Sequence, residues 1–285
     1  MTQIDPIERK PVQRVEPSRA AAWKNLVFGL CYRLGLNALA RVVTRNKPRI
    51  LMFHHITEEG GPGLTPSKMN KMLAYIADRY NVMSASQLAQ HMTDHGQCPQ
   101  NTIVLTFDDG YTSFADYAMP LLEAHNLPAT LFVCPTLIAE EGNEPTLFDG
   151  QELVDWPTLA QLASSPLVEI GAHSMTHPVL SATSDTDSQS EIESSKETLE
   201  ARLGRPITSF CYPYGMGGDF TDAHRDMVRD AGYSCATASW FGFVELGDDD
   251  IYALPRIGCD NFQTFGHFRK NVDGLEFLQR RLLTD

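Results

Sequence analysis

Short apolar runs alternate with segments of helical periodicity along most of this chain, and this alternation limits the fold more than any other feature. The runs have strand length, and the segments between them repeat apolar residues every three or four positions. We expect strands at residues 49–53, 80–84, 102–107, 129–134, 168–172, 207–212 and 233–238, and helices at residues 65–76, 86–95, 116–125, 155–163, 188–203, 222–231, 261–271 and 275–283. This order predicts an α/β fold, either a barrel or an open parallel sheet.

The first 48 residues differ from the rest and are expected to form a separate N-terminal region ahead of a main domain at 49–285. Residues 1–24 read as a loosely held arm, and residues 26–43 as an amphipathic helix. In this helix Arg33, Asn37 and Arg41 interrupt the apolar sequence at intervals of four. Two placements fit the pattern: the helix docks on its own domain, or residues 26–45 contact a membrane surface.

Charge narrows the classes of partner. The chain has 23 Lys and Arg against 36 Asp and Glu, a net charge of -13, which argues against nucleic-acid binding. Residues 1–50 nevertheless carry ten basic and three acidic side chains. Six cysteines lie scattered without paired spacing, and the first 25 residues contain three prolines and no secretory signal pattern. We therefore expect buried thiols and a location in the cytoplasm or on the inner face of the cell membrane.

Polar residues gather where several expected strands end. His54 and His55 follow the first strand, and Asp108 and Asp109 follow the strand at 102–107. Two further clusters follow the strands at 168–172 and 207–212, namely His173 with His177, and Pro213–Tyr214–Gly215. In a barrel the carboxyl ends of parallel strands form one rim, where active sites are built. The four clusters are therefore expected to converge.

The residue types in these clusters suit a hydrolytic metal centre. His173 and His177 supply two imidazole nitrogens, and one neighbouring carboxylate completes a set of three ligands with an open position for water. The other aspartate of the Asp108–Asp109 pair is then free to accept a proton from the attacking water. The sequence predicts a metal-dependent hydrolase.

Three segments resemble the motifs of the polysaccharide deacetylase family, the NodB-homology domain of carbohydrate esterase family 4. They are Thr106–Gly110 (TFDDG), His173–His177 (HSMTH) and Tyr212–Gly215 (YPYG), in the family's order, and the similarity runs from about residue 49 to about residue 257. The resemblance implies a distorted (β/α) barrel and removal of N-acetyl groups, or sometimes O-acetyl groups, from a carbohydrate.

The resemblance also implies roles for residues. Asp109, His173 and His177 would bind one divalent metal ion, with Zn²⁺ the first choice and Co²⁺, Ni²⁺ and Mn²⁺ the alternatives. Asp108 would be the general base, and the backbone N–H of Tyr214, after Pro213, would stabilise the oxyanion.

The chain departs from the family pattern at two places. Many members begin the third motif with an arginine that orients the catalytic aspartate, but Cys211 stands there. We expect Arg256, at the end of another strand-like run, to replace it, although a surface salt bridge is an alternative for this residue. The late histidine motif of the general acid is also missing. Residues 51–55 instead resemble the circularly permuted branch that acts on poly-N-acetylglucosamine, which makes His54 the acid and His55 the alternative.

The remaining expectations concern the loop and the substrate. Ser174 is expected to hydrogen-bond within the metal-site loop and not to act as a nucleophile, because no GxSxG pattern accompanies it. The substrate is expected to be an N-acetylated polysaccharide, oligosaccharide or lipid-linked precursor. Two alternatives stay open: a carbohydrate O-acetyl esterase on the same fold, and a catalytically silent carbohydrate-binding protein.

Overall fold

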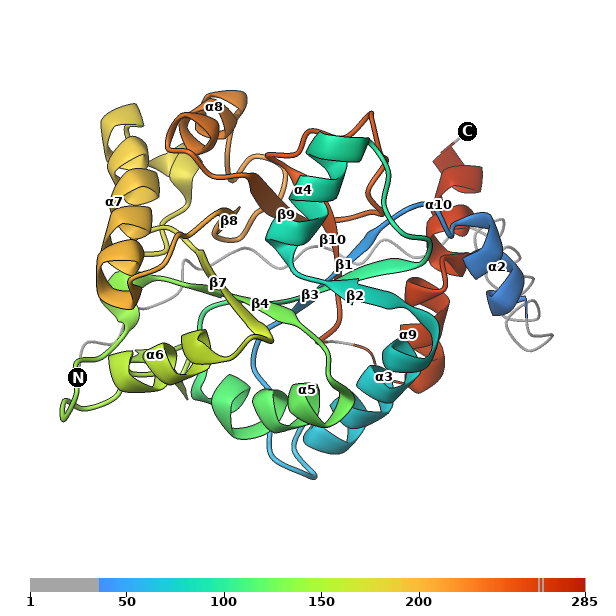
Figure 1. Cartoon of the computed structure of the whole chain (residues 1–285), viewed down its shortest axis with the longest axis horizontal. Helices are drawn as coiled ribbons and strands as arrows, with labels where there is room; N and C mark the ends of the chain where they lie inside the picture. The colour runs from blue at the N-terminus through green and yellow to red at the C-terminus, as the bar shows by residue number, and fades with distance from the viewer. Residues whose placement is uncertain (1–35, 261, 263, 285) are drawn as a thin grey trace, which may run out of the picture.

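Seven parallel strands close into a barrel in the computed structural model, which describes residues 36–260, 262 and 264–284 (Figure 1). Around the barrel the order is β1 (Arg49–Phe53), β10 (Leu254–Gly258), β9 (Cys235–Phe241), β8 (Ser209–Cys211), β7 (Val168–Ala172), β4 (Ala129–Val133) and β3 (Thr102–Phe107). Pairing of β1 with β3 closes the circle, and β2 (Asn81–Met83) adds to the start of β3. The barrel form of the predicted α/β fold is confirmed.

Helices surround the strands because the strands are apolar on both faces. Every residue of β3 and β4 is buried, as expected for strands covered on one side by helices and filled on the other by the barrel interior. The outer layer contains α3 (Pro66–Arg79), α5 (Met119–His125) after a π-helical turn (Phe114–Ala118), α6 (Trp156–Ser164), α7 (Asp185–Leu203), α8 (Asp222–Asp230), α9 (Phe265–Val272) and α10 (Leu275–Thr284).

Helix α4 (Ala85–His95) closes the end of the barrel at which the strands begin. Its Leu88 and Ala89 belong to one buried apolar cluster with Ile50 of β1 and Cys235 of β9. At the start of the helix, the backbone N–H of Ala85 donates to Thr130 on β4. This contact with yet another strand places α4 across the mouth, so only the opposite end, where the strands finish, is open for a site.

Most predicted elements are found within a few residues of their expected bounds. The helix predicted at 188–203 begins earlier than expected: α7 starts at Asp185, because the side chain of Ser184 caps it by accepting from the Asp187 N–H. The hairpin of β5 (Leu147–Phe148) and β6 (Gln151–Glu152) is a further element that the sequence analysis did not predict.

The described part of the N-terminal region contains α2 (Asn37–Val43), which packs beside α10 (Figure 1). The predicted arm at 1–24 and the first part of the amphipathic helix at 26–35 lie outside the described residues. Among the helices that the structure describes, none combines the length and the apolar character needed to cross a bilayer.

Candidate active site

The four polar clusters meet at the open end of the barrel, around a cavity of about 280 Å³. The cavity is lined by His54, Asp108, Asp109, His173, His177 and Tyr214, among others. These residues follow β1, β3, β7 and β8, so the convergence expected from the strand ends is present. Pro213, His55 and Ser174 adjoin these residues but do not line the cavity.

Asp109, His173 and His177 form a buried group with the spacing of a metal site. Oδ1 of Asp109 lies 3.5 Å from Nε2 of His173 and 3.4 Å from Nε2 of His177. Zinc–ligand distances of about 2.0–2.1 Å in tetrahedral geometry place ligand atoms roughly 3.3 Å apart, so these three atoms fit around one ion. The donor set of one carboxylate and two imidazoles also suits Zn²⁺ and related cations.

Charge and hydrogen bonding in this group agree with a cation. His173 donates from Nδ1 to the carbonyl oxygen of Cys211 at 2.7 Å, which leaves the Nε2 lone pair free for a metal. Burial lowers the pKa of His173, but Cys211 and Asp109 outweigh burial and raise this pKa well above its usual value. Burial raises the pKa of Asp109, whereas the two histidines hold it well below its usual range. The pocket therefore favours positive charge beside an ionised carboxylate.

The backbone at the site is strained. Five residues other than glycine that line the cavity or belong to its loops have positive φ, namely Asp109 (71°), Asp149 (49°), Ser174 (62°), His177 (63°) and Tyr214 (60°). Each such conformation costs on the order of 1 kcal/mol or more and persists only where surrounding contacts enforce it. At Ser174 the enforcing contact is visible, because its Oγ accepts from the His177 N–H at 3.0 Å. This bond agrees with the expected place of Ser174 within the loop.

Helix α7 holds the same loop from outside. The Glu191 carboxylate accepts from the backbone N–H groups of Met175 and Thr176, both at 2.8 Å, and from the Thr176 hydroxyl at 2.6 Å. The sequence analysis did not single out Glu191, and as one of many acids on a polar helix it carries no local signal. It is a positioning residue for the loop that carries His177.

Arg256 forms a paired hydrogen bond with Asp108. Nη1 and Nη2 of Arg256 donate to the two carboxylate oxygens at 2.7 and 2.8 Å, and both side chains are buried. Burial alone would raise the pKa of Asp108, but the guanidinium and His54 outweigh it and lower this pKa. Cys211 is small enough to leave room for Arg256, whose Nη2 also donates to Sγ at 3.1 Å. The alternative for Arg256, a salt bridge at the surface, is excluded because both side chains are buried.

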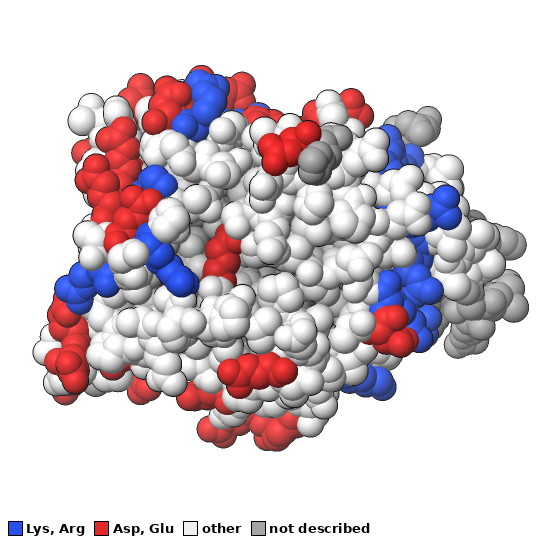
Figure 2. All heavy atoms as spheres, viewed as in Figure 1, with Lys and Arg blue, Asp and Glu red and all other residues white. Residues whose placement is uncertain are grey.

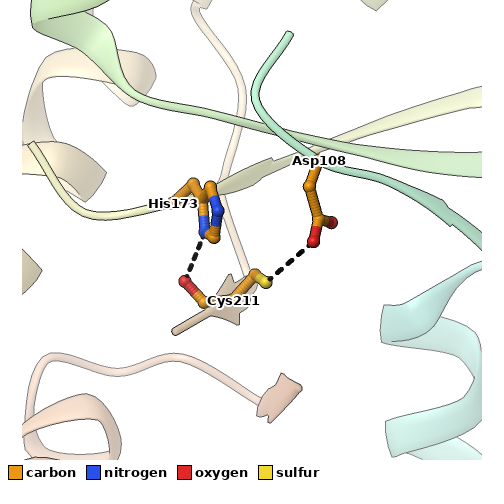
Figure 3. A group of neighbouring side chains, drawn as sticks. All are labelled: Asp108, His173 and Cys211. Atoms are coloured by element: carbon orange, nitrogen blue, oxygen red, sulfur yellow. Dashed lines mark hydrogen bonds between the residues drawn. The ribbon is translucent and has the colours of Figure 1, made fainter. Parts of the chain in front are cut away.

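A second group of potential ligands, Asp108, His173 and Cys211, also lies within metal-binding reach (Figure 3). Arg256 places its positive charge on this group, because it donates to both Asp108 oxygens and to the Cys211 sulfur. A divalent ion there would sit against a guanidinium and repel it. Asp109, His173 and His177 are therefore the better metal site.

His54 lies beside Asp108 on the wall of the cavity. Its Nε2 lies 3.8 Å from Oδ2 of Asp108, while its Nδ1 is 2.6 Å from Oδ2 of Asp260. The other Asp260 oxygen accepts from the His54 backbone N–H at 2.9 Å. Burial lowers the pKa of His54, but the Asp260 hydrogen bond and the charge of Asp108 outweigh it and raise the pKa to about 9. His54 is thus placed to carry a proton at neutral pH.

Asp260 was missed by the sequence analysis, although one signal could have found it: it is a carboxylate shortly after the end of a strand, β10. His55 points elsewhere, because adjacent residues at a strand end face opposite sides. Its Nδ1 lies 3.1 Å from the Ser113 hydroxyl, its ring meets the edge of Tyr111, and burial lowers its pKa.

Aromatic rings form the walls beside His177. The rings of Tyr214 and Phe148 each lie 4.9 Å from the His177 ring, centroid to centroid. Phe148 comes from the unpredicted β5–β6 hairpin, which therefore forms one wall of the site. Pro213 instead shapes the turn behind Tyr214, where its carbonyl oxygen accepts from the Gly215 N–H at 2.6 Å.

Comparisons with known proteins agree with this geometry. The family model described as polysaccharide deacetylase matches residues 95–236. A Bacillus subtilis protein named "Putative polysaccharide deacetylase YxkH" is 22% identical over 209 residues, which cover 73% of this chain and 70% of that protein. The Escherichia coli poly-beta-1,6-N-acetyl-D-glucosamine N-deacetylase is 27% identical over 134 residues, covering 43% of this chain but only 20% of the relative.

Solved structures show the same fold. The structure of IcaB from Ammonifex degensii superposes with a TM-score of 0.69 at 17% identity, covering 80% of this chain and 97% of the other. The family match spans the metal-site motifs and the barrel strands that carry them. From these motifs, the barrel and the matches, we conclude that the chain belongs to the polysaccharide deacetylase family.

Proposed function

We propose that this protein is a metal-dependent hydrolase that removes N-acetyl groups from a polymer of N-acetylglucosamine. One observation carries the proposal: a buried Asp–His–His group lies beside an aspartate held by Arg256, and His54, hydrogen-bonded to Asp260, lies 3.8 Å from that aspartate in the same cavity. The names of relatives such as the Escherichia coli enzyme support a β-1,6-linked substrate.

Asp109, His173 and His177 are the residues that would hold the cation, for which we propose Zn²⁺. When bound, the cation would polarise the acetyl carbonyl and lower the pKa of the attacking water. Asp108, kept ionised by Arg256, accepts the proton from that water as general base. The backbone N–H of Tyr214 is our proposed hydrogen-bond donor to the oxyanion.

His54 completes the reaction by donating a proton to the leaving nitrogen. The nitrogen of the tetrahedral intermediate leaves poorly unless it is protonated, so hydrolysis of an amide needs a general acid that still holds its proton at neutral pH. Asp260 supplies this state by raising the His54 pKa to about 9. This favours N-deacetylation over the alternative O-acetyl esterase, because an ester can expel its oxygen as an alkoxide, whereas an unprotonated amide nitrogen leaves far less readily and needs the acid. The complete acid–base pair argues against a catalytically silent binding protein.

Acetate release tests the proposal. Purified protein supplied with Zn²⁺ is expected to release acetate from β-1,6-linked N-acetylglucosamine oligomers, faster than from acetylated xylan. Asp108→Asn should retain the metal but lose activity by about 10²–10⁴-fold, whereas His173→Ala should lose both. Metal content by mass spectrometry, expected at about one ion per chain, separates the two variants. Faster release from xylan, or full activity in Asp108→Asn, would overturn the proposal.

A further inference from the structure

A second groove lies beside the active-site cavity and has no part in the proposed chemistry. It measures about 460 Å³ and is formed by the residues that follow β4, the start of α6 and the end of α7. Its lining includes Thr136, Asn143, Thr146, Trp156 and Arg202. Small-molecule sites usually measure about 300–1,000 Å³, so this groove, here called the distal groove, is large enough to hold part of a carbohydrate chain.

Only a narrow ridge separates the distal groove from the active-site cavity. Thr136 on the groove wall donates from its backbone N–H and its hydroxyl to the carbonyl oxygen of Met175, at 3.3 and 2.5 Å. The next residue, Thr176, is exposed and lines the active-site cavity. In the β5–β6 hairpin region, Thr146 lines the groove and Phe148 lines the cavity. Consecutive Cα atoms are about 3.8 Å apart, so one polymer chain can cross the ridge and lie in both.

The walls of the distal groove carry polar groups that the protein itself does not use. The Thr146 hydroxyl and the Asn143 amide both donate and accept hydrogen bonds, and the Glu144 carboxylate accepts them. Within the described part of the chain, none of these three side chains has a hydrogen bond or an ion pair with another residue. Sugar hydroxyl and acetamide groups are both donors and acceptors, so they match this set.

The floor of the groove is aromatic and rigid. Trp156 is buried, and the Arg202 guanidinium lies over its ring, at 4.3 Å from the ring centroid. Nη2 of Arg202 also forms an ion pair with Glu140 at 2.6 Å. These two contacts fix the guanidinium, and the ion pair occupies only part of its five N–H donors. An aromatic floor with a few fixed polar groups is typical of a ligand site.

Charge restricts the class of ligand. The sequence has no Lys or Arg between residues 80 and 195, and the one arginine in the groove lining is paired with Glu140. In Figure 2, acidic side chains gather along the left-hand edge of the molecule, where Figure 1 places α6 and α7. A polyanion would be repelled from this side. A neutral sugar chain is accepted, and its deacetylated units, which carry ammonium groups, are attracted.

We propose that the distal groove binds units of the same N-acetylglucosamine polymer that enters the active site, away from the unit that loses its acetyl group. This inference rests on the proposed function, which supplies the substrate. A chain held in the groove presents its next units to the cavity at a high effective concentration. Long chains are therefore better substrates than chains too short to reach the groove.

The dependence of activity on chain length tests the proposal. We expect kcat/KM for acetate release by the Zn²⁺-loaded wild type to rise from the disaccharide to long β-1,6-linked N-acetylglucosamine oligomers. The double variant Asn143→Ala/Arg202→Ala should lose about tenfold in kcat/KM on the long oligomers, the effect of one or two hydrogen bonds, and nothing on the disaccharide. Arg229→Ala removes an exposed, ion-paired arginine on α8 and should behave like the wild type at every length.

Binding is measured separately from catalysis. A long oligomer is titrated calorimetrically into Asp108→Asn protein, with and without the two groove substitutions, which should weaken its affinity about tenfold. The proposal is overturned if the oligomer does not bind, if the substitutions leave its affinity unchanged, or if they reduce kcat/KM equally for short and long chains. A wild type that binds the oligomer in this groove but releases no acetate would overturn only the proposed function.

Discussion

At the scale of single residues, the arginine that holds Asp108, the proposed base, comes from a different strand than in the family motif. The family motif places it next to β8, where this chain has Cys211, and the structure supplies Arg256 from β10 instead. The guanidinium reaches the same carboxylate because Cys211 is small and buried, and because Arg256 is anchored by the carbonyl oxygen of Ala238 at 2.7 Å. An arginine–aspartate ion pair is therefore present, although the arginine stands at a different place in the sequence than in the family motif.

Replacing Arg256 is expected to change the acidic limb of the pH–rate profile. In Arg256→Met, burial still raises the pKa of Asp108 but the guanidinium no longer lowers it, so the pKa rises. A general base works only above its pKa, and the activity should therefore disappear at a higher pH than in the wild type. We expect kcat/KM at neutral pH to fall by about 10²-fold or more. Cys211→Ala, which leaves the ion pair intact, is the control; an unshifted limb in Arg256→Met would contradict the assignment.

The basic limb is expected to depend on Asp260. A general acid works below its pKa, so activity should decline as the pH rises through about 9, the raised pKa of His54. Asp260→Asn removes the main partner that raises this pKa, and the basic limb should move towards the ordinary histidine value of about 6.5. His55→Asn is the matched comparison on the neighbouring ring. The pH profile of kcat/KM is measured for both variants. If the basic limbs of Asp260→Asn and His55→Asn lay at the same pH, Asp260 would have no role in raising the pKa of His54.

At the scale of elements, the metal-site loop depends on a helix that contributes no ligand. The loop after β7 carries two residues with positive φ, and Glu191 of α7 satisfies two of its backbone N–H groups. Helix α7 begins three residues earlier than the sequence indicated, because Ser184 acts as its cap. Serine-rich sequence is typical of loops, but serine also favours the N-terminus of a helix.

Loss of the Glu191 carboxylate is expected to weaken metal binding without removing a ligand. In Glu191→Ala the loop loses the acceptor for two N–H groups, so His177 is less firmly oriented. Affinity for Zn²⁺, measured by competition with a chelator, should fall by about 10–100-fold. Glu197→Ala changes an exposed acid on the same helix and should leave the affinity as it is. Equal affinities in the two variants would show that Glu191 has no part in orienting the site.

At the scale of the whole molecule, a buried cluster at the opposite end ties the chain together. Asp273, between α9 and α10, accepts from the hydroxyls of Tyr75 at 2.8 and 2.9 Å and of Tyr80 at 2.7 Å. Arg49, the first residue of β1, donates from Nε to the carbonyl oxygen of Val272 at 2.7 Å. The cluster joins α3, the first barrel strand and the C-terminal helices, and Arg41 adds α2 to it.

Asp273→Ala is expected to lower the stability of the whole domain. The substitution leaves buried hydroxyls and a nearby arginine without their acceptor, and breaking a buried charge network costs about 3–5 kcal/mol. Urea unfolding should show this loss in the free energy of unfolding, while acetate release per folded molecule is retained. Asp230→Ala, at an exposed aspartate on α8, should cost less than about 1 kcal/mol. A similar small loss for Asp273→Ala would contradict the role of the cluster.

The sequence by itself determined the order of strands and helices, because apolar periodicity is a local property. It also indicated the metal-site residues, since Asp109, His173 and His177 lie in short segments whose residue types are chemically specific. Tertiary structure alone revealed Asp260 as the partner of His54, whereas the sequence had already indicated Arg256 as the arginine beside Asp108. Arg256 lies 148 residues from Asp108, and Asp260 lies 206 residues from His54.

The orientation of α2 was likewise decided only by the tertiary structure. Its periodicity shows a polar and an apolar face, and a surface helix usually buries the apolar face. The choice depended on Asp273, a buried carboxylate more than 230 residues away, which draws Arg41 and thereby the polar face inward. The local sequence pattern specifies which side chains share a face of the helix. The charges buried in the folded domain decide which of these faces packs against the domain.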